Sequence, residues 1–275
     1  MKKHHFGAIM PAMPIKVGTL SLAYDDTGGG RPLLLIHGYP LHRGLWAPQI
    51  SGLSSLARVV APDLPGHGES DVPPGPYSMD GFADTCLSLL DALGITEPVV
   101  LGGLSMGGYV AFAAWRRHPE RIAGLILAAT RAGADSPEAR AGREASMTTI
   151  TREGVRPIAD AMTPRLLAPG TDRARPELVA TVHAMLASAP ATGALGALAG
   201  LRDRADSTST LGTITVPTLV IHGAEDQLIP LAEAERTAAE TPNATLIVIE
   251  GAGHLPNLEQ PAAFNTAIEA FLNRL

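Results

Sequence analysis

The chain has 275 residues, a net charge of −6, and 45% hydrophobic but only 4% aromatic residues. This length suits one large domain, or one domain with an insertion, and allows a core that needs neither disulfides nor metals. The basic residues form no block, which argues against a nucleic-acid partner. The single cysteine, Cys86, excludes an intrachain disulfide and lies in an apolar run that favours a buried, inert thiol.

Neither an export signal nor a membrane span is expected from the sequence. The basic N-terminus is followed by Pro11, Pro14 and Lys16, which interrupt the apolar stretch that an export signal requires. The longest apolar runs, such as residues 122–129, are far shorter than the ~18 residues that cross a bilayer. Together with the single cysteine, these features favour a cytoplasmic protein without a membrane partner.

Six short apolar runs recur along the chain, separated by helical stretches. They lie at residues 33–36, 58–61, 99–101, 125–129, 218–221 and 246–249. Each run is apolar without alternation, so we expect strands that are buried on both faces. Such strands, separated by helices, predict an α/β fold with a mostly parallel sheet. Before them, residues 16–24 alternate between polar and apolar and predict an antiparallel edge hairpin.

Residues 131–211 contain no strand-like run. Helices are expected there around residues 137–150, 175–187 and 192–204, with prolines between them. We therefore predict a helical cap at residues 131–211, inserted between two strands of one sheet. The core domain then comprises residues 1–130 and 212–275.

The strongest local signal is a Gly-x-Ser-x-Gly motif that runs from Gly103 to Gly107 and is centred on Ser105. It follows a predicted strand and precedes an apolar stretch that predicts a buried helix. In that context the turn is so tight that the positions two residues either side of the serine must lack side chains. The turn lifts the Ser105 hydroxyl above the sheet, beside the free N–H groups of the helix N-terminus. Ser105 is therefore the predicted nucleophile.

A serine hydroxyl needs a base, and in this arrangement an acid and then a histidine should follow along the chain. Asp226 lies just past the fifth apolar run and His254 just past the sixth. Both are therefore expected at the carboxyl edge of the sheet, as is Ser105. Glu225 is the competing acid, and Glu250 is expected to hold the loop that carries His254.

An oxyanion hole requires two converging N–H donors. One is expected from the backbone of Met106, the residue after the nucleophile. The other is expected from the loop after the first apolar run, where Pro40 has no N–H and Tyr39 is therefore the candidate.

The other eight histidines are expected to be structural or exposed. His37 and His222, for example, each end a strand before a glycine. No pair of histidines has the His-Glu-x-x-His spacing, and one cysteine cannot build a zinc site, so we expect no metal.

Together these motifs resemble the α/β-hydrolase family, and within it the small cofactor-free esterases, enol-lactonases and perhydrolase-type enzymes. The resemblance covers nearly the whole chain and includes His37-Gly38-Tyr39-Pro40, Asp63-Leu64-Pro65-Gly66-His67-Gly68, the turn at Ser105, Val216-Pro217-Thr218-Leu219 and Gly253-His254. It implies an eight-stranded, mostly parallel sheet with a helical cap and no cofactor. It also implies a triad of Ser105, Asp226 and His254. The oxyanion donors that it implies are Tyr39 and Met106.

The expected function is that of a serine hydrolase that cleaves small to medium carboxylic esters or lactones through an acyl-enzyme. The related haloalkane dehalogenases and epoxide hydrolases have aspartate at the position of Ser105, so their reactions are disfavoured. Perhydrolysis, acyl transfer and C–C bond hydrolysis reuse the same residues and stay open, as does a slow-turnover receptor on a hydrolase scaffold. The expected partner is a small-molecule ester or lactone, and no oligomeric state is predicted. Arg131 either binds an anionic substrate group or pairs with an acid such as Asp135, and the ion pair is favoured.

The predicted pocket lies under residues 131–211 and is closed and mostly aliphatic. Besides Tyr39 and Met106, its expected lining residues are Leu228, Leu255, Met162, Leu166 and Leu186. The last three come from the cap and are equally compatible with ordinary core packing. Such a pocket favours acetyl to butyryl esters or small lactones over esters of ten or more carbons.

Overall fold

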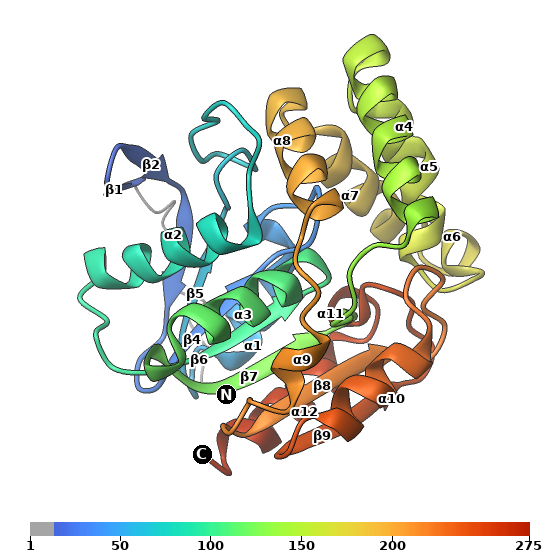
Figure 1. The fold of residues 1–275 in the computed structure, drawn as a ribbon. Coiled ribbons are helices and arrows are strands. Elements are labelled where there is room, and N and C mark those ends of the chain that lie inside the picture. The colour runs from blue at the N-terminus through green and yellow to red at the C-terminus, as the bar shows by residue number, and fades with distance from the viewer. Residues whose placement is uncertain (1–13) are drawn as a thin grey trace, which may run out of the picture.

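The structure is a computed structural model that describes residues 14–275 (Figure 1). The predictions for the basic N-terminus and for the first 13 residues of the core domain lie outside the described residues. Within them, a seven-stranded sheet in the order β3-β5-β4-β6-β7-β8-β9 forms the centre of the molecule. β3 pairs antiparallel with β5, and all the other neighbouring strands of this sheet pair parallel.

The strands are β1 (Ile15–Val17), β2 (Leu20–Leu22), β3 (Tyr24–Thr27), β4 (Pro32–Ile36), β5 (Arg58–Pro62), β6 (Val99–Leu104), β7 (Ile122–Ala128), β8 (Thr218–Gly223) and β9 (Ala244–Ile249). β1 and β2 form an antiparallel hairpin, which confirms the prediction for this region. Because they pair with each other apart from the main sheet, that sheet has seven strands in residues 14–275 rather than the implied eight.

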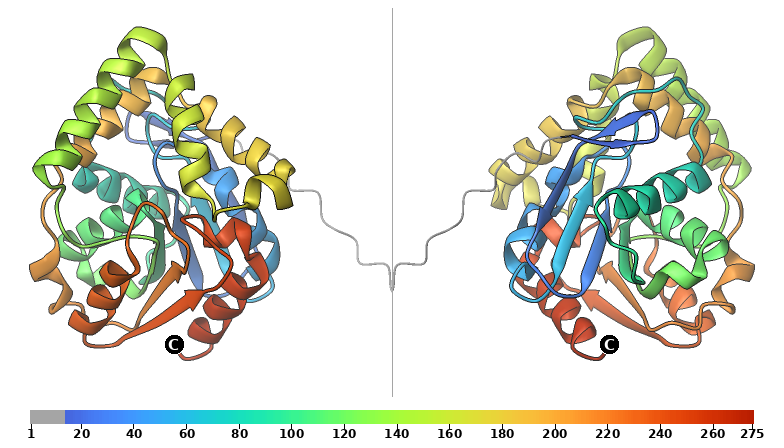
Figure 2. Two further views of the ribbon diagram at one scale, coloured as in Figure 1. Left: turned by 90° about the vertical axis from the view of Figure 1, so that its right-hand side faces the viewer. Right: turned by 90° about the vertical axis from the view of Figure 1, so that its left-hand side faces the viewer.

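The α-helices are α1 (Ala47–Leu53), α2 (Met79–Ala92), α3 (Met106–Arg117), α4 (Pro137–Glu153), α5 (Arg156–Leu166), α6 (Thr171–Ala174), α7 (Pro176–Ala187), α8 (Ala191–Arg202), α9 (Thr208–Leu211), α10 (Leu231–Glu240), α11 (Pro256–Glu259) and α12 (Pro261–Leu272). Two short 3₁₀ helices, η1 (Arg43–Trp46) and η2 (Pro119–Arg121), precede α1 and β7. Figures 1 and 2 show α4 to α8 grouped at one end of the sheet.

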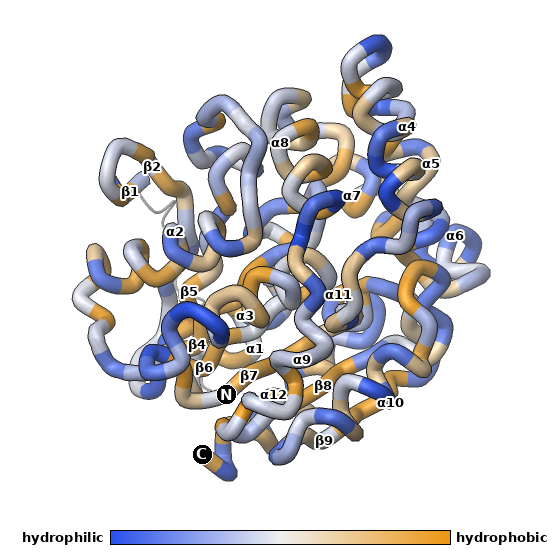
Figure 3. Tube along the Cα trace, viewed as in Figure 1, coloured by the Kyte–Doolittle hydropathy of each residue, from blue (hydrophilic) through white to orange (hydrophobic). Residues whose placement is uncertain are grey.

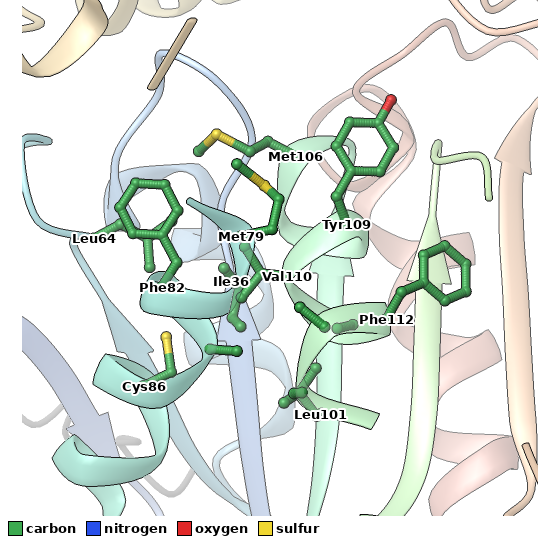
Figure 4. Packing of buried hydrophobic residues seen from close by; sticks show 14 of the residues in the cluster. Ile36, Leu64, Met79, Phe82, Cys86, Leu101, Met106, Tyr109, Val110 and Phe112 are labelled. Carbon is green, nitrogen blue, oxygen red and sulfur yellow. The ribbon is translucent and has the colours of Figure 1, made fainter. Parts of the chain in front are cut away.

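Helices cover both faces of the sheet because the pleat of each strand sends alternate side chains to opposite faces. In β4, Leu34 and Ile36 join the hydrophobic cluster that contains α2 and α3, whereas Leu33 and Leu35 join the cluster that contains α1 and α12. This confirms the predicted burial on both faces for the central strands. Figure 4 shows the first cluster, with Cys86 of α2 pointing among its apolar neighbours.

Cys86 is buried as predicted, and burial raises the pKa of its thiol to about 12. β9 differs from the prediction, because its side chains are alternately exposed and partly buried. Thr245 and Ile247 are exposed, and Ile249 is the one residue of the strand that is fully buried. β9 is the last strand of the sheet, so the flanking helices cover it only in part.

Three of the helices between β7 and β8 were predicted, namely α4, α7 and α8, but α5, α6 and α9 were not. Prolines in this region indicated breaks, yet Pro157 lies in the first turn of α5 and Pro164 near its end. A proline in the first turn costs little, because the N–H groups of that turn have no partner within the helix.

Hydropathy distinguishes this helical region from the sheet. Figure 3 shows apolar strands at the centre and long hydrophilic stretches along α4, whose one fully buried residue is Ile150. Among residues 14–275, no single helix is long and apolar enough to cross a bilayer, and α7 and α8 meet that test only as a pair bent by 90°.

Candidate active site

Ser105 lies on the turn that joins β6 to α3. Its backbone has φ 55° and ψ −111°, a conformation that L-residues rarely adopt and that costs about 1–3 kcal/mol. The turn is tight because a Cβ on Gly103 would lie 2.1 Å from the carbonyl oxygen of Gly107. A Cβ on Gly107 would lie 2.1 Å from the carbonyl oxygen of Ile36. Both glycines are therefore required, as the motif predicted.

His254 and Asp226 are brought together from the ends of neighbouring strands. Nδ1 of His254 lies 2.7 Å from Oδ2 of Asp226, and both side chains are almost completely buried. The other carboxylate oxygen of Asp226 accepts the backbone N–H groups of Leu228 (2.8 Å) and Ile229 (3.0 Å). The competing acid, Glu225, is exposed.

This environment decides which nitrogen of His254 is available for proton transfer. Burial raises the pKa of Asp226, but the hydrogen bond and charge of His254 and the two backbone N–H groups hold that pKa below its ordinary value. The ionised carboxylate can only accept, so Nδ1 of His254 carries the proton. Nε2 therefore keeps a free lone pair, as a general base requires.

A second histidine lies beside the same carboxylate. Nε2 of His222 is 2.9 Å from the carbonyl oxygen of Ile229 and 3.6 Å from Oδ2 of Asp226. Since a carbonyl oxygen accepts, this nitrogen carries the proton. Burial lowers the pKa of His222, so the ring stays neutral and acts as the expected structural hydrogen-bonding group.

Glu259, rather than Glu250, holds the loop that carries His254. The carboxylate of Glu259 accepts the N–H of Gly253 at 2.6 Å, the N–H of Ala168 at 2.8 Å and the hydroxyl of Thr171 at 2.9 Å. Glu250 is exposed, so the expectation for it was wrong. The difference arises because α11 folds back over the loop, which the linear order of the residues does not reveal.

The two expected oxyanion donors, Met106 and Tyr39, both lie next to the turn that carries Ser105. Met106 is the first residue of α3, so its N–H is among those a helix leaves unpaired. The loop of Tyr39 approaches from β4, because a Cβ on Gly38 would lie 3.4 Å from the Cβ of Ser105. Nε2 of His37 accepts the N–H of Leu64 at 3.0 Å, which leaves Nδ1 to donate to the carbonyl oxygen of Gly38 at 2.9 Å.

Ser105 and His254 line one cavity of about 390 Å³. Five further residues that the sequence analysis proposed for the site also line it, namely Tyr39, Met106, Leu228, Met162 and Leu166. Leu255 and Leu186 do not line it, and the prediction for them was wrong. Both are fully buried in the hydrophobic cluster that contains α1 and α12, where apolar neighbours surround them.

The cavity is also less aliphatic than predicted. Arg131, Arg143, Arg165 and Tyr109 contribute to its wall. Tyr109 follows Ser105 by four residues, so it lies one helical turn further along the same face of α3, a spacing that could have identified it. Figure 4 shows its hydroxyl pointing away from the packed core. No comparable signal marked the arginines of α4 and α5, because their orientation depends on how these helices pack.

The expected ion pair of Arg131 is present, with a guanidinium nitrogen 2.8 Å from Oδ1 of Asp135. Within residues 14–275, no group of three or more His, Cys, Asp or Glu side chains is arranged to hold a metal ion.

A mostly parallel sheet with a serine on a tight strand-to-helix turn is typical of α/β hydrolases. A family model for the alpha/beta hydrolase fold matches residues 31–261, and the chain belongs to that family. The chain is 31% identical over 275 residues to 3-oxoadipate enol-lactonase 2 of Acinetobacter baylyi, covering 100% of this chain and 99% of the relative.

Solved structures include similar folds. A thermophilic esterase from Thermogutta terrifontis, described as malate bound, matches with a TM-score of 0.93 and 44% identity over 96% of this chain and 99% of that chain. The enol-lactonase from Burkholderia xenovorans LB400 matches with a TM-score of 0.86 and 30% identity over 94% and 98% of the two chains.

The contact between His254 and Asp226 predicts that Asp226→Asn lowers kcat by about 10⁴-fold with little change in KM. Asparagine would present an N–H or a neutral oxygen to the imidazole and no longer stabilise the protonated ring. The measurement is steady-state hydrolysis of p-nitrophenyl butyrate. Glu225→Gln is the matched control and should stay within about twofold of the wild type, because this exposed side chain does not meet His254. A larger loss in Glu225→Gln than in Asp226→Asn would reverse the assignment of the acid.

The contacts of Glu259 predict that Glu259→Gln lowers the free energy of unfolding by about 1–3 kcal/mol, because glutamine has one acceptor oxygen for three donors, two of them in buried hydrogen bonds. We also expect kcat to fall, since the loop of His254 loses its anchor. Glu250→Gln makes the same chemical change at an exposed position and should alter stability by less than about 0.5 kcal/mol. Urea unfolding and steady-state kinetics on both variants test this, and equal effects would refute a role for Glu259.

Proposed function

We propose that this chain hydrolyses small carboxylic esters or lactones by a serine mechanism that passes through an acyl-enzyme. The observation that carries the proposal is that Ser105, on its strained turn, and His254, paired with Asp226, line the same cavity. The relatives support it, since the similar proteins reported above include an esterase and two enol-lactonases.

In the proposed reaction, Nε2 of His254 takes the proton of the Ser105 hydroxyl as its oxygen attacks the carbonyl carbon. The N–H groups of Met106 and Tyr39 stabilise the negative charge that develops on the carbonyl oxygen. His254 then gives its proton to the leaving alcohol, or to the ring oxygen of a lactone. Water activated by the same imidazole cleaves the acyl-enzyme and restores Ser105. Throughout, ionised Asp226 stabilises the protonated imidazole.

We also propose that residues 131–211 act as a cap over this site. This proposal is supported by the wall of the cavity, to which α4 contributes Arg143 and α5 contributes Met162 and Leu166. The cap is tied to the core through Glu259, which binds Ala168 and Thr171 as well as the loop of His254. The cap helices and the base therefore share one anchor.

Ser105→Ala should lower kcat by about 10⁶-fold, because the members of a triad act as a unit. An organophosphate should label the wild-type protein stoichiometrically, and peptide mass spectrometry should place the label on Ser105. Sustained turnover of p-nitrophenyl butyrate distinguishes an enzyme from a receptor that releases one equivalent of product and stops. Near-normal activity in Ser105→Ala, or a label on another residue, would remove Ser105 from this role.

The size of the cavity predicts a preference for short acyl groups. A volume of about 390 Å³ is near the lower end of the range for small-molecule sites. A longer chain gains no further burial once this space is filled and must then displace the cap. We expect kcat/KM in a p-nitrophenyl ester series to be highest for acetyl to butyryl groups and to fall beyond them. A maximum at ten or more carbons would contradict the proposal.

A further inference from the structure

The cavity beside Ser105 carries an excess of positive charge. Three arginines line it, Arg131 before α4, Arg143 on α4 and Arg165 on α5, whereas no Asp or Glu is among its lining residues in the part of the chain described. A purely neutral ester gains no charge–charge attraction from guanidinium groups in the wall of its pocket. The charge of this wall therefore points to a feature of the substrate beyond the ester bond.

A single carboxylate lies behind these arginines. Oδ1 of Asp135 is 2.8 Å from a terminal nitrogen of Arg131 and 2.6 Å from Nη1 of Arg204, and Oδ2 is 3.2 Å from Nε of Arg143. The Asp135 side chain is fully buried. Burial raises its pKa, but the hydrogen bonds and charges of Arg204 and Arg143 hold that pKa below the ordinary value. One negative charge is thus shared among three guanidinium groups.

Of the three arginines that pair with Asp135, Arg131 and Arg143 border the cavity and carry the surplus charge there. Arg204 is almost fully buried and is absent from the lining of the cavity; its terminal nitrogens pair with Asp135 and donate to the carbonyl oxygens of Leu201 and Gly133, although its Nε has no partner in the described part of the chain. Arg131 and Arg143 each keep about a quarter of their side-chain surface exposed. Because partly buried charges are weakly screened, an anion in the cavity would gain substantial electrostatic stabilisation there.

Unused hydrogen-bond donors lie on the same residues. Nε of Arg131 and the hydroxyl of Tyr39 are buried and have no partner in the described part of the chain. The Tyr39 side chain is 7% exposed. Burial raises the pKa of its hydroxyl, and the nearby charge of Arg143 acts on this pKa in the opposite direction. Arg143 forms its hydrogen bond to Asp135 through Nε, and no hydrogen bond within residues 14–275 engages its terminal nitrogens. A buried donor without a partner destabilises the protein unless a ligand or water supplies an acceptor.

We propose that Arg131, Arg143 and the Tyr39 hydroxyl form a carboxylate-binding subsite, so that the substrate is an ester or lactone that carries a second, ionised carboxylate. The guanidinium groups match the planar geometry of a carboxylate, and the phenol adds a third donor. The substrate class rests on the proposed function for the bond that is cleaved. The anion subsite rests on the charges and donors of the cavity alone.

The test compares two esters of nearly equal shape, monoethyl glutarate, which is an anion at pH 7.5, and ethyl glutaramate, its neutral amide. The readout is the ratio of their kcat/KM values in the full-length protein, with product measured by chromatography. We expect the wild type to favour the anion by about tenfold or more, as a charged hydrogen bond allows. A ratio near or below one would overturn the proposal.

Two variants and a matched control locate the effect. Arg143→Gln and, separately, Arg131→Gln should each lower this ratio by about tenfold. Asp135 keeps two arginine partners in either variant, so the buried carboxylate stays paired. Arg140→Gln removes an exposed charge from the same helix outside the cavity and should change the ratio by less than about twofold, since screened surface charges interact weakly. If Arg140→Gln and Arg143→Gln lowered the ratio equally, the preference for the anion would come from the overall electrostatic field of the protein and not from a subsite.

A binding measurement separates this proposal from the proposed function. Calorimetry on the inactive Ser105→Ala protein should show saturable binding of glutarate that is about tenfold tighter than binding of butyrate, which has one carboxylate. Adding Arg143→Gln should weaken glutarate and leave butyrate nearly unchanged. If wild-type protein hydrolyses neither ester, the proposed function fails, and glutarate binding still decides the subsite. Equal affinity for glutarate and butyrate would refute the subsite even in an active esterase.

Discussion

Two glycines flank Ser105 because the backbone of its turn leaves no room for a side chain at either position. Gly103 touches the carbonyl of Gly107, and Gly107 in turn touches the carbonyl of Ile36 at the end of β4. The second of these two contacts holds the start of α3 against the strand whose next residues form the loop of Tyr39. Ser105, the N-terminus of α3 and the loop of Tyr39 are thus placed by the same pair of packing contacts. The strained φ of Ser105 is maintained by these contacts, since no local preference favours it.

The contact between His254 and Asp226 depends on the other half of the sheet. β8 and β9 pair in parallel register, so their carboxyl ends bring the loops of Asp226 and His254 side by side. Gly253 shows how closely this region is packed, because a Cβ there would lie 2.6 Å from the backbone nitrogen of Ala168. Glu259 binds both sides of that contact. Movement of the region after α5 would therefore disturb the orientation of the imidazole.

Charge is distributed unevenly over the cavity. Beside His254, the ionised Asp226 is buried against the imidazole and two backbone N–H groups, so its charge acts on the imidazole and is not screened by solvent. Behind the opposite wall, the single negative charge of Asp135 is paired with three arginines, and two of these border the cavity. In the proposals made above, the first arrangement supports proton transfer and the second supports substrate selection. Both need the burial that α4 and α5 provide, because water would screen the same charges outside it.

The sequence by itself determined the parts of this protein whose constraints are local. The turn at Ser105 needs glycine at two fixed positions. Asp226 and His254 each follow a strand that can be recognised from its apolar composition alone. These residues and the α/β fold were therefore predictable. The role of Glu259, the lining arginines of α4 and α5, and the burial of Leu186 were decided by tertiary structure. The sequence shows that α4 is polar, but not which side of it faces the core, and it shows Glu250 and Glu259 without revealing that α11 turns back onto the loop of His254. These features arise where helices far apart in the chain meet, and no short pattern of residues encodes such a contact.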